Sequence, residues 1–92
     1  MKVLFVTFRL RAPWCRSLKD KRSIVKSLIA ELKKHNVAVC ESGAQNAIQF
    51  IELSAATLVQ NHAQGDSTAQ ILESSVLGAT DAELYEVLFE YR

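Results

Sequence analysis

The sequence predicts a single α+β domain in which a four-stranded antiparallel sheet carries two helices on one face. Two stretches, residues 2–10 and 83–91, alternate their side chains with the period of a strand. Residues 17–34 instead repeat their apolar positions with the period of a helix. The chain has 92 residues, which is enough for one hydrophobic core and no more, so residues 1–92 are expected to form one domain.

Residues 2–10 form the first predicted strand because they are rich in β-branched and aromatic side chains. The face that we expect to line the core carries Leu4, Val6, Phe8 and Leu10. Pro13 lacks a backbone N–H and therefore ends the strand in a connection. Trp14 in that connection either covers the core, which is the commoner fate of a large aromatic residue, or remains an exposed contact residue.

The stretch from residue 17 to 34 is the best-defined helix of the sequence. Ser17 is expected to cap it, with Asp20 reaching back to the amide of Ser17 as in a capping box. Its predicted apolar face consists of Leu18, Ile24, Val25, Leu28, Ile29 and Leu32. Lys21 points toward this face, so its stem is expected to lie along the core edge with the ammonium reaching solvent or an acid such as Glu41 or Glu52. The alternative is that Lys21 is a cation positioned for a ligand.

One flank of the same helix concentrates positive charge. At 100° per residue, the four side chains that share this flank are Lys19, Arg22, Lys26 and Lys33. The preceding loop adds Arg11 and Arg16. These six cations could follow the phosphate backbone of a nucleic acid, although basic helix flanks are also common as ordinary solvated surface.

The rest of the chain supplies two strands, a helix and a last strand. We expect strands at 37–42 and 47–59, a helix capped by Ser67 with Gln70 at the capping-box position, and a strand at 83–91. The predicted apolar face of this helix consists of Ala69, Ile71, Leu72, Val76 and Leu77, and Gly78 is its expected stop. The last strand is expected to alternate Tyr85 and Val87 on one side with Leu84 and Leu88 on the other.

The order β-α-β-β-α-β, with two right-handed crossovers, predicts a ferredoxin-like fold. This arrangement serves many unrelated functions, so it does not by itself indicate an activity. The helix-free face of the sheet is expected to be half polar, with Val3, Phe5, Phe50, Leu84 and Leu88 as its apolar part.

Charge is unevenly distributed along the chain. Residues 1–34 hold ten Lys and Arg against two acids, a net charge of +8, whereas residues 35–92 hold one Arg against eight acids, a net charge of −7. Such a division makes a dipolar molecule unless the fold interleaves the two halves.

No metal or cofactor site is expected. Cys15, His35, Cys40 and His62 match no zinc-binding spacing, and Cys40 is expected to be a small buried residue of a strand. No signal peptide or membrane-spanning stretch appears, which favours a cytoplasmic protein that does not contact a membrane.

The segment from Pro13 and Arg16 through Leu28 (Arg-Ser-Leu-Lys-Asp-Lys-Arg-Ser-Ile-Val-Lys-Ser-Leu) resembles the signature of the YlxP-like family of small bacterial proteins of unknown function. Further similarity lies at residues 36–41, at Gly43, at Glu52-Leu53 and at Ala56, and becomes loose from His62 onward. Trp14-Cys15 departs from the Gly-Ala that the family often has. The resemblance implies a ferredoxin-like fold, no established enzymatic activity and genes placed beside those of translation and ribosome maturation.

We therefore expect a non-enzymatic protein that binds RNA or a ribosomal subunit through the basic flank. A second possibility is a homodimer, or another structural or small-ligand-binding module, that buries the helix-free face of the sheet. An acylphosphatase-like hydrolase is less favoured. Arg11, Arg16, Asn46 and Asn61 supply the residue types, but the loop at 11–16 has no glycine and its proline removes an amide donor.

Overall fold

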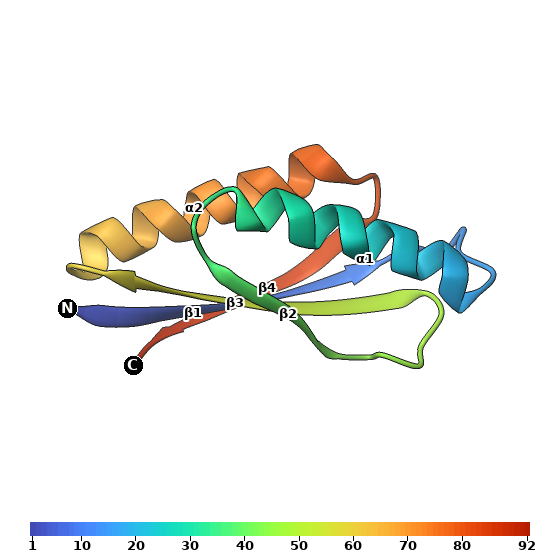
Figure 1. Cartoon of the computed structure of the whole chain (residues 1–92), viewed down its shortest axis with the longest axis horizontal. Helices are drawn as coiled ribbons and strands as arrows, with labels where there is room; N and C mark the ends of the chain where they lie inside the picture. The colour runs from blue at the N-terminus through green and yellow to red at the C-terminus, as the bar shows by residue number, and fades with distance from the viewer.

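The computed structural model describes all 92 residues and confirms the predicted order of elements. Strands and helices follow one another as β1 (Lys2–Arg11), α1 (Leu18–Lys33), β2 (Ala38–Gly43), β3 (Phe50–Val59), α2 (His62–Ala79) and β4 (Glu83–Tyr91). Both helices run along the same face of the sheet, and the two chain ends lie beside each other at one end of the molecule (Figure 1). Neither helix has both the length and the apolar character needed to cross a lipid bilayer.

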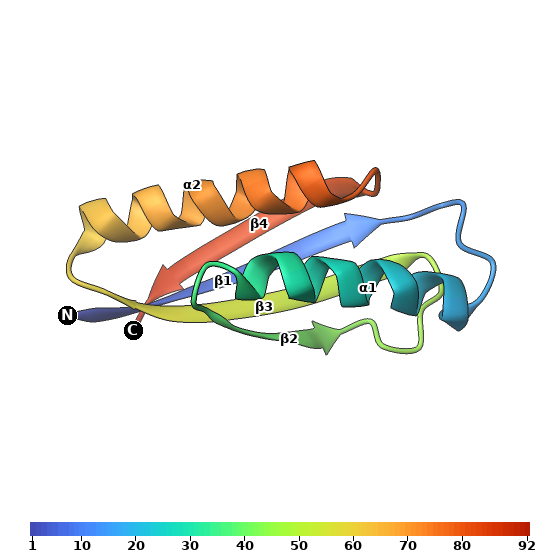
Figure 2. The same cartoon turned by 45° about the horizontal axis from the view of Figure 1, so that its top comes forward.

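The sheet has the strand order β2-β3-β1-β4, and every neighbouring pair is antiparallel. This is the ferredoxin-like topology that the sequence predicts. Helix α1 lies over the β2–β3 side and α2 over the β1–β4 side (Figure 2). In this strand order β1, from the basic residues 1–34, lies between β3 and β4, which come from the acidic residues 35–92.

The core lies between the sheet and the two helices. The predicted face of β1 is fully buried, since Leu4, Val6, Phe8 and Leu10 are all 0% exposed. From α1, the side chains of Leu28 and Leu32 are equally inaccessible, and Ile51 and Leu53 of β3 complete the central layer. Alternating strand residues and one helix stripe thus form a single core.

The cap of α1 is close to the predicted one. The Ser17 hydroxyl accepts a hydrogen bond from the Asp20 amide at 3.1 Å. The Asp20 carboxylate, however, accepts from the backbone N–H of Arg16 at 3.1 Å instead of from that of Ser17. The capping carboxylate therefore fixes the residue before the cap, which ties the preceding loop to the helix.

Helix α2 begins earlier than predicted, at His62 instead of after Ser67. Asn61 caps it by accepting from the Gln64 amide at 2.9 Å, and the Gln64 side chain accepts in turn from the Gln60 amide. This resembles the capping box expected at Ser67, placed six residues upstream, except that the Gln64 side chain bonds to the residue before the cap. Gly65 lies within this helix, and Tyr91 packs against it so closely that a Cβ there would lie 2.4 Å from the ring.

The buried face of α2 is also narrower than predicted. Ala69, Leu72 and Val76 are buried, whereas Ile71 and Leu77 are 52% and 56% exposed. The helix continues past Gly78 and ends at Ala79. With its start moved upstream, the buried stripe includes Gly65, and Ile71 and Leu77 fall outside it.

Two strand details differ from the prediction. Strand β3 begins at Phe50, not at residue 47, because residues 44–49 form a connection whose last carbonyl, that of Gln49, accepts from the Ala12 amide at 2.8 Å. A register shift in the β1–β4 pairing between Arg9 and Leu10 places Leu84 opposite Leu10, on the core side. Tyr85 instead reaches the helix-free face, where its ring meets that of Phe50. The predicted sides of these two residues were therefore wrong, since a bulge reverses the alternation.

Candidate nucleic-acid interface

The flank of α1 that carries Lys19, Arg22, Lys26 and Lys33 is exposed along its whole length. None of the four side chains lies within 4 Å of a carboxylate, so the basic edge, as we call this set, has no internal ion pair. His35, just beyond the helix, bonds to Ser75 of α2 at 3.0 Å. Helical geometry places the basic edge on the opposite flank, away from α2 and toward the outer strand β2. The four cations extend over about 21 Å, given the rise of a helix.

Arg16 and Arg11, the two loop cations predicted to join this edge, have different positions. Arg16 is exposed at the N-terminal end of α1 beside the connection between β2 and β3, and it forms no ion pair. Arg11 belongs to β1, and its Nη1 lies 4.0 Å from Glu83 of β4. Arg16 thus lies unpaired just before the end of α1 at which the basic edge begins, whereas Arg11 lies beside a carboxylate of β4.

Trp14 is 51% exposed, so the expectation that it covers the core is wrong. Contacts of other residues hold the loop that carries Trp14 against the core. Gln49 donates from its side chain to the Pro13 carbonyl at 3.1 Å, and buried Ala12 and Cys15 fill the space beneath. With the core already covered, the indole remains available at the end of the molecule where α1 begins.

Lys21 is buried despite its charge, with 1% of its surface exposed. Its Nζ lies 3.2 Å from a carboxylate oxygen of Glu41 and donates to the Ala47 carbonyl at 2.8 Å and to the Ala44 carbonyl. Glu41, one of the two acids anticipated from the sequence, is therefore its partner, but the ammonium does not reach solvent. All three ammonium protons have acceptors, so Lys21 fixes the β2–β3 connection to α1 and is not available to a ligand.

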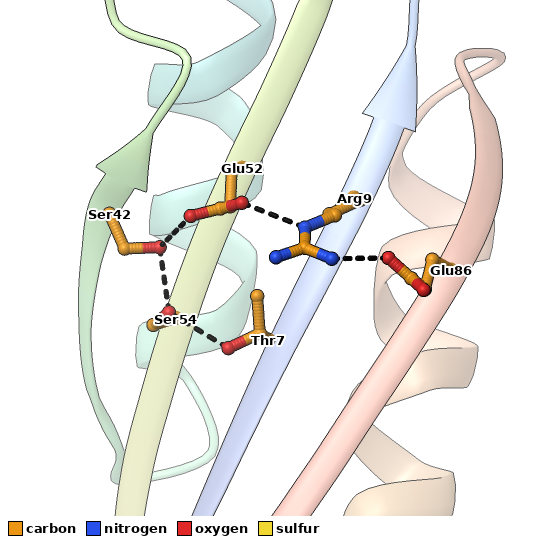
Figure 3. A network of polar contacts seen from close by, with 6 residues as sticks. All are labelled: Thr7, Arg9, Ser42, Glu52, Ser54 and Glu86. Carbon is orange, nitrogen blue, oxygen red and sulfur yellow. Dashed lines mark hydrogen bonds and ion pairs between the residues drawn. The ribbon is translucent and has the colours of Figure 1, made fainter.

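The helix-free face of the sheet carries a polar network that crosses all four strands (Figure 3). Arg9 of β1 donates from Nε to Glu52 of β3 at 2.8 Å and from Nη1 to Glu86 of β4. Its hydrogen bonds to these two carboxylates raise the pKa of the Arg9 guanidinium above its ordinary value. Two acids thus neutralise one cation with one negative charge left over, which makes this face unsuitable for phosphate.

A hydroxyl chain continues the network toward β2. The Ser54 hydroxyl donates to Ser42 at 2.7 Å and bonds to Thr7 at 3.1 Å, and Ser42 bonds to Glu52 at 3.4 Å. No buried side-chain nitrogen or oxygen lacks a partner. The sequence did not indicate this network because its members come from four strands and share no spacing along the chain. The only signal was the alternation within each strand, which places these polar residues on the helix-free face.

Phe5 and Phe50 lie on the helix-free face, not in the core. The Arg92 guanidinium lies 5.0 Å from the centroid of the Phe5 ring, which is partly covered, while Phe50 is 43% exposed. A base-stacking sheet module presents free aromatic rings among cations. Here the central cation, Arg9, is neutralised, and Arg92 covers the ring of Phe5. Both features weigh against base binding on the sheet.

The loop between β1 and α1 uses most of its own amides. Ala12 donates to Gln49, Cys15 donates to Ala12 and Arg16 donates to Asp20. Pro13 has no N–H to give. A loop that binds phosphate needs several convergent free amides, so this one lacks the donors that acyl-phosphate hydrolysis requires.

The two cysteines differ in accessibility. Cys15 is buried, and desolvation, with a contribution from nearby Asp20, raises the pKa of its thiol. Cys40 is exposed on the helix-free face, so its expected burial is wrong, because odd and even residues of β2 face opposite ways and its own face has no helix cover. No three His, Cys, Asp or Glu side chains converge in a way that could hold a metal ion.

Fold and surface together describe a small α+β domain in which four unpaired cations share one flank of a helix. The chain belongs to the DUF503 family, described as a protein of unknown function, whose family model matches residues 3–88. A comparison with curated protein sequences finds no match.

Among solved structures, the chain is similar to a de novo designed protein, Foldit4, with a TM-score of 0.52 and 10% identity over 99% of this chain and 94% of that one. It is also similar to part of the YXEP protein of Bacillus subtilis, a dinuclear metal-binding peptidase of the M20 family, with a TM-score of 0.44 and 14% identity. That match covers 98% of this chain and 25% of the peptidase. At such low identity, the likeness to the designed protein concerns the fold alone.

Proposed function

We propose that this protein is a non-enzymatic RNA-binding protein of the cytoplasm that associates with a ribosomal subunit through the basic edge of α1. The observation that carries the proposal is the absence of any acidic partner for Lys19, Arg22, Lys26 and Lys33. Free cations along an exposed helix neutralise phosphates and release counterions, which gives affinity without sequence specificity. The resemblance to the YlxP-like family, with its gene neighbourhood in translation, supports the choice of the ribosome.

Trp14 and Arg16 extend the proposed surface at the start of α1. The exposed indole offers a flat face on which an unpaired base can stack, a contact that is tolerant of base identity. Arg16 is free to pair with a phosphate nearby. We therefore expect single-stranded or looped RNA to be preferred over a continuous duplex, whose bases are already stacked.

Trp14 also supplies the test, because it is the only tryptophan of the chain. We expect its fluorescence to change when a single-stranded RNA oligonucleotide is titrated in at low salt. The logarithm of affinity should fall linearly with the logarithm of salt concentration, with a slope of about −3 to −4 for four to six phosphate contacts.

The decisive variant is Arg22→Glu combined with Lys26→Glu. It should fold like the wild type and bind RNA about 100-fold more weakly at ~0.1 M salt, since two phosphate contacts become repulsive. The matched control, Lys2→Glu with Arg92→Glu, changes net charge equally at the chain ends and should bind nearly as well as the wild type. Equal weakening by both variants would mean that only net charge matters, and absence of wild-type binding at low salt would disprove the proposal.

Co-sedimentation with ribosomal subunits, repeated with both variants, tests the ribosomal part.

A second candidate role, compatible with the first, is homodimerisation through the helix-free face. Four large apolar side chains remain exposed there, namely Phe50, Leu58, Tyr85 and Leu88. The guanidinium of Arg9 and the carboxylates of Glu52 and Glu86 already pair with one another, which lowers the cost of covering this face. If this face self-associates, light scattering should show a dimer that Leu88→Lys disrupts, whereas Ile71→Lys, an equally exposed apolar site on α2, leaves it intact. A monomer at high concentration would contradict this role.

A further inference from the structure

A groove runs along the edge of the molecule opposite to β2, between α2 and the outer strand β4. Two adjoining hollows form it, and both include Glu73 of α2 and Val87 of β4. Phe89 and Leu77 form part of its apolar floor, and about half of each side chain is open to solvent, at 51% and 56% exposed. Asp66 lies on the same flank of α2 as Glu73, two helical turns away. The groove therefore combines an apolar floor with an acidic wall.

The backbone of β4 is available along this groove. Strand β4 has a single strand neighbour, β1. The reciprocal hydrogen bonds between Val3 and Arg92, of 2.8 and 2.9 Å, fix which residues of β4 bond inward. Because this pattern alternates in an antiparallel ladder, Leu88 and Glu90 also bond toward β1. Val87, Phe89 and Tyr91 consequently direct their N–H and C=O groups to the open edge.

Charge decides which kind of strand fits this edge. Residues 62–91 contain six acidic side chains and no Lys or Arg. Glu83, Glu86 and Glu90 each have an arginine partner. The other three, Asp66, Glu73 and Asp81, form no ion pair. A second copy of β4 would bring a like-charged edge, whereas a basic segment would meet complementary charge.

We propose that the groove between α2 and β4 binds an extended, basic segment of a partner protein, which adds to the sheet as a strand beside β4. Backbone hydrogen bonds to Val87, Phe89 and Tyr91 supply affinity, as in other cases of strand addition. Side chains of the segment that face α2 alternate with those that face away. The first set consists of Lys or Arg residues whose stems lie over Phe89 and whose charges meet Glu73 and Asp66. This site lies at the opposite edge of the sheet from α1, so it is independent of the proposed RNA surface.

The probe for this proposal is an eight-residue peptide of alternating Lys and Val with blocked ends, compared with its Glu–Val counterpart. Amide resonances are followed by nuclear magnetic resonance during titration at low salt. The Lys–Val peptide should shift the amides of Val87, Phe89 and Tyr91 and slow their hydrogen exchange, while the Glu–Val peptide should do neither. Shifts confined to β2, the other outer strand, would overturn the proposal. Shifts of the β4 amides on raising the protein concentration alone would also overturn it, because they would make a second copy the occupant.

Two matched pairs of variants separate the contributions of charge and backbone. Glu73→Lys should weaken peptide binding about tenfold, whereas Asp81→Lys, an identical charge change outside the groove, should weaken it less than about threefold. Phe89→Ala and Phe89→Pro both remove the ring, but only the proline also removes an outward N–H. The proline variant should bind at least about fivefold more weakly than the alanine variant, given the worth of one hydrogen bond. Equal binding within either pair would contradict strand addition at this groove. Unchanged RNA binding by all four variants is expected and keeps this result separate from the RNA proposal.

Discussion

The basic edge of α1 and the helix-free face of the sheet both carry cations from the N-terminal part of the chain, yet they differ in what those cations can do. Arg22 and Lys26 on α1 have no carboxylate within 4 Å. Arg9 and Arg11 on β1 each meet at least one glutamate from a neighbouring strand. Positive charge in the sequence is therefore not the same as positive charge offered to a ligand.

The strand order is the cause of this difference. Strand β1 lies between β3 and β4, both drawn from the acidic part of the sequence, so its arginines are neutralised across the strands. Helix α1 covers the β2–β3 side, and its outward flank faces only solvent. The fold thus cancels the charge asymmetry in the sheet and preserves it on one helix, which is why we assign RNA binding to the helix.

The largest effect expected from this comparison concerns two lysines of the same helix, one paired and one free. Lys21→Met should lower the free energy of unfolding by about 3 kcal/mol, because it leaves Glu41 without a cation and two backbone carbonyls without their donor. Lys26→Met should leave stability unchanged and weaken RNA binding. Urea denaturation of both variants measures the difference. Equal stability of the two variants would show that the buried contacts of Lys21 are not maintained in solution.

A smaller effect is expected from Arg9→Gln on the sheet. This change leaves Glu52 and Glu86 facing each other without the intervening cation, so the variant should be less stable than the wild type at low salt. High salt should narrow the gap, since it screens repulsion between partly exposed carboxylates. RNA binding should be retained. If Arg9→Gln weakened RNA binding as strongly as Arg22→Glu with Lys26→Glu, the distinction between the two regions would fail.

Much of the fold follows from local patterns in the sequence. The buried face of β1 follows the period of a strand, the apolar stripe of α1 follows that of a helix, and the cap at Ser17 follows from residues next to it. The structure confirms all three. The start of α2 was misplaced because the sequence offers two similar caps, at Asn61–Gln64 and at Ser67–Gln70, and Gly65, a poor helix former, directly follows the first. That glycine lies within the helix because of Tyr91, twenty-six residues later, which no local pattern reveals.

The candidate site was partly predictable for the same reason. Helical spacing identified the four cations of the basic edge, since they share one element. It could not show that Arg11 lies beside Glu83 or that Lys21 is enclosed by the β2–β3 connection. The bulge in β4, which exchanges the sides of Leu84 and Tyr85, arises from pairing with β1 and likewise has no signal in the alternating sequence. Contacts between elements distant in the chain are what the sequence leaves open.

The last and smallest effect is a difference in thiol reactivity that reports on both regions without altering stability. Cys40 lies exposed on the helix-free face, whereas Cys15 is buried under the loop that leads to the basic edge, and burial raises its thiol pKa. Iodoacetamide at pH 8 should therefore alkylate Cys40 first and Cys15 only after unfolding, because the thiolate is the reacting species. Mass spectrometry with a Cys40→Ser control identifies the modified site. If the helix-free face dimerises, Cys40 should react more slowly as the protein concentration rises, while RNA bound to α1 leaves its rate unchanged. Protection of Cys40 by RNA would instead place the nucleic acid on the sheet and reverse our assignment of the two regions.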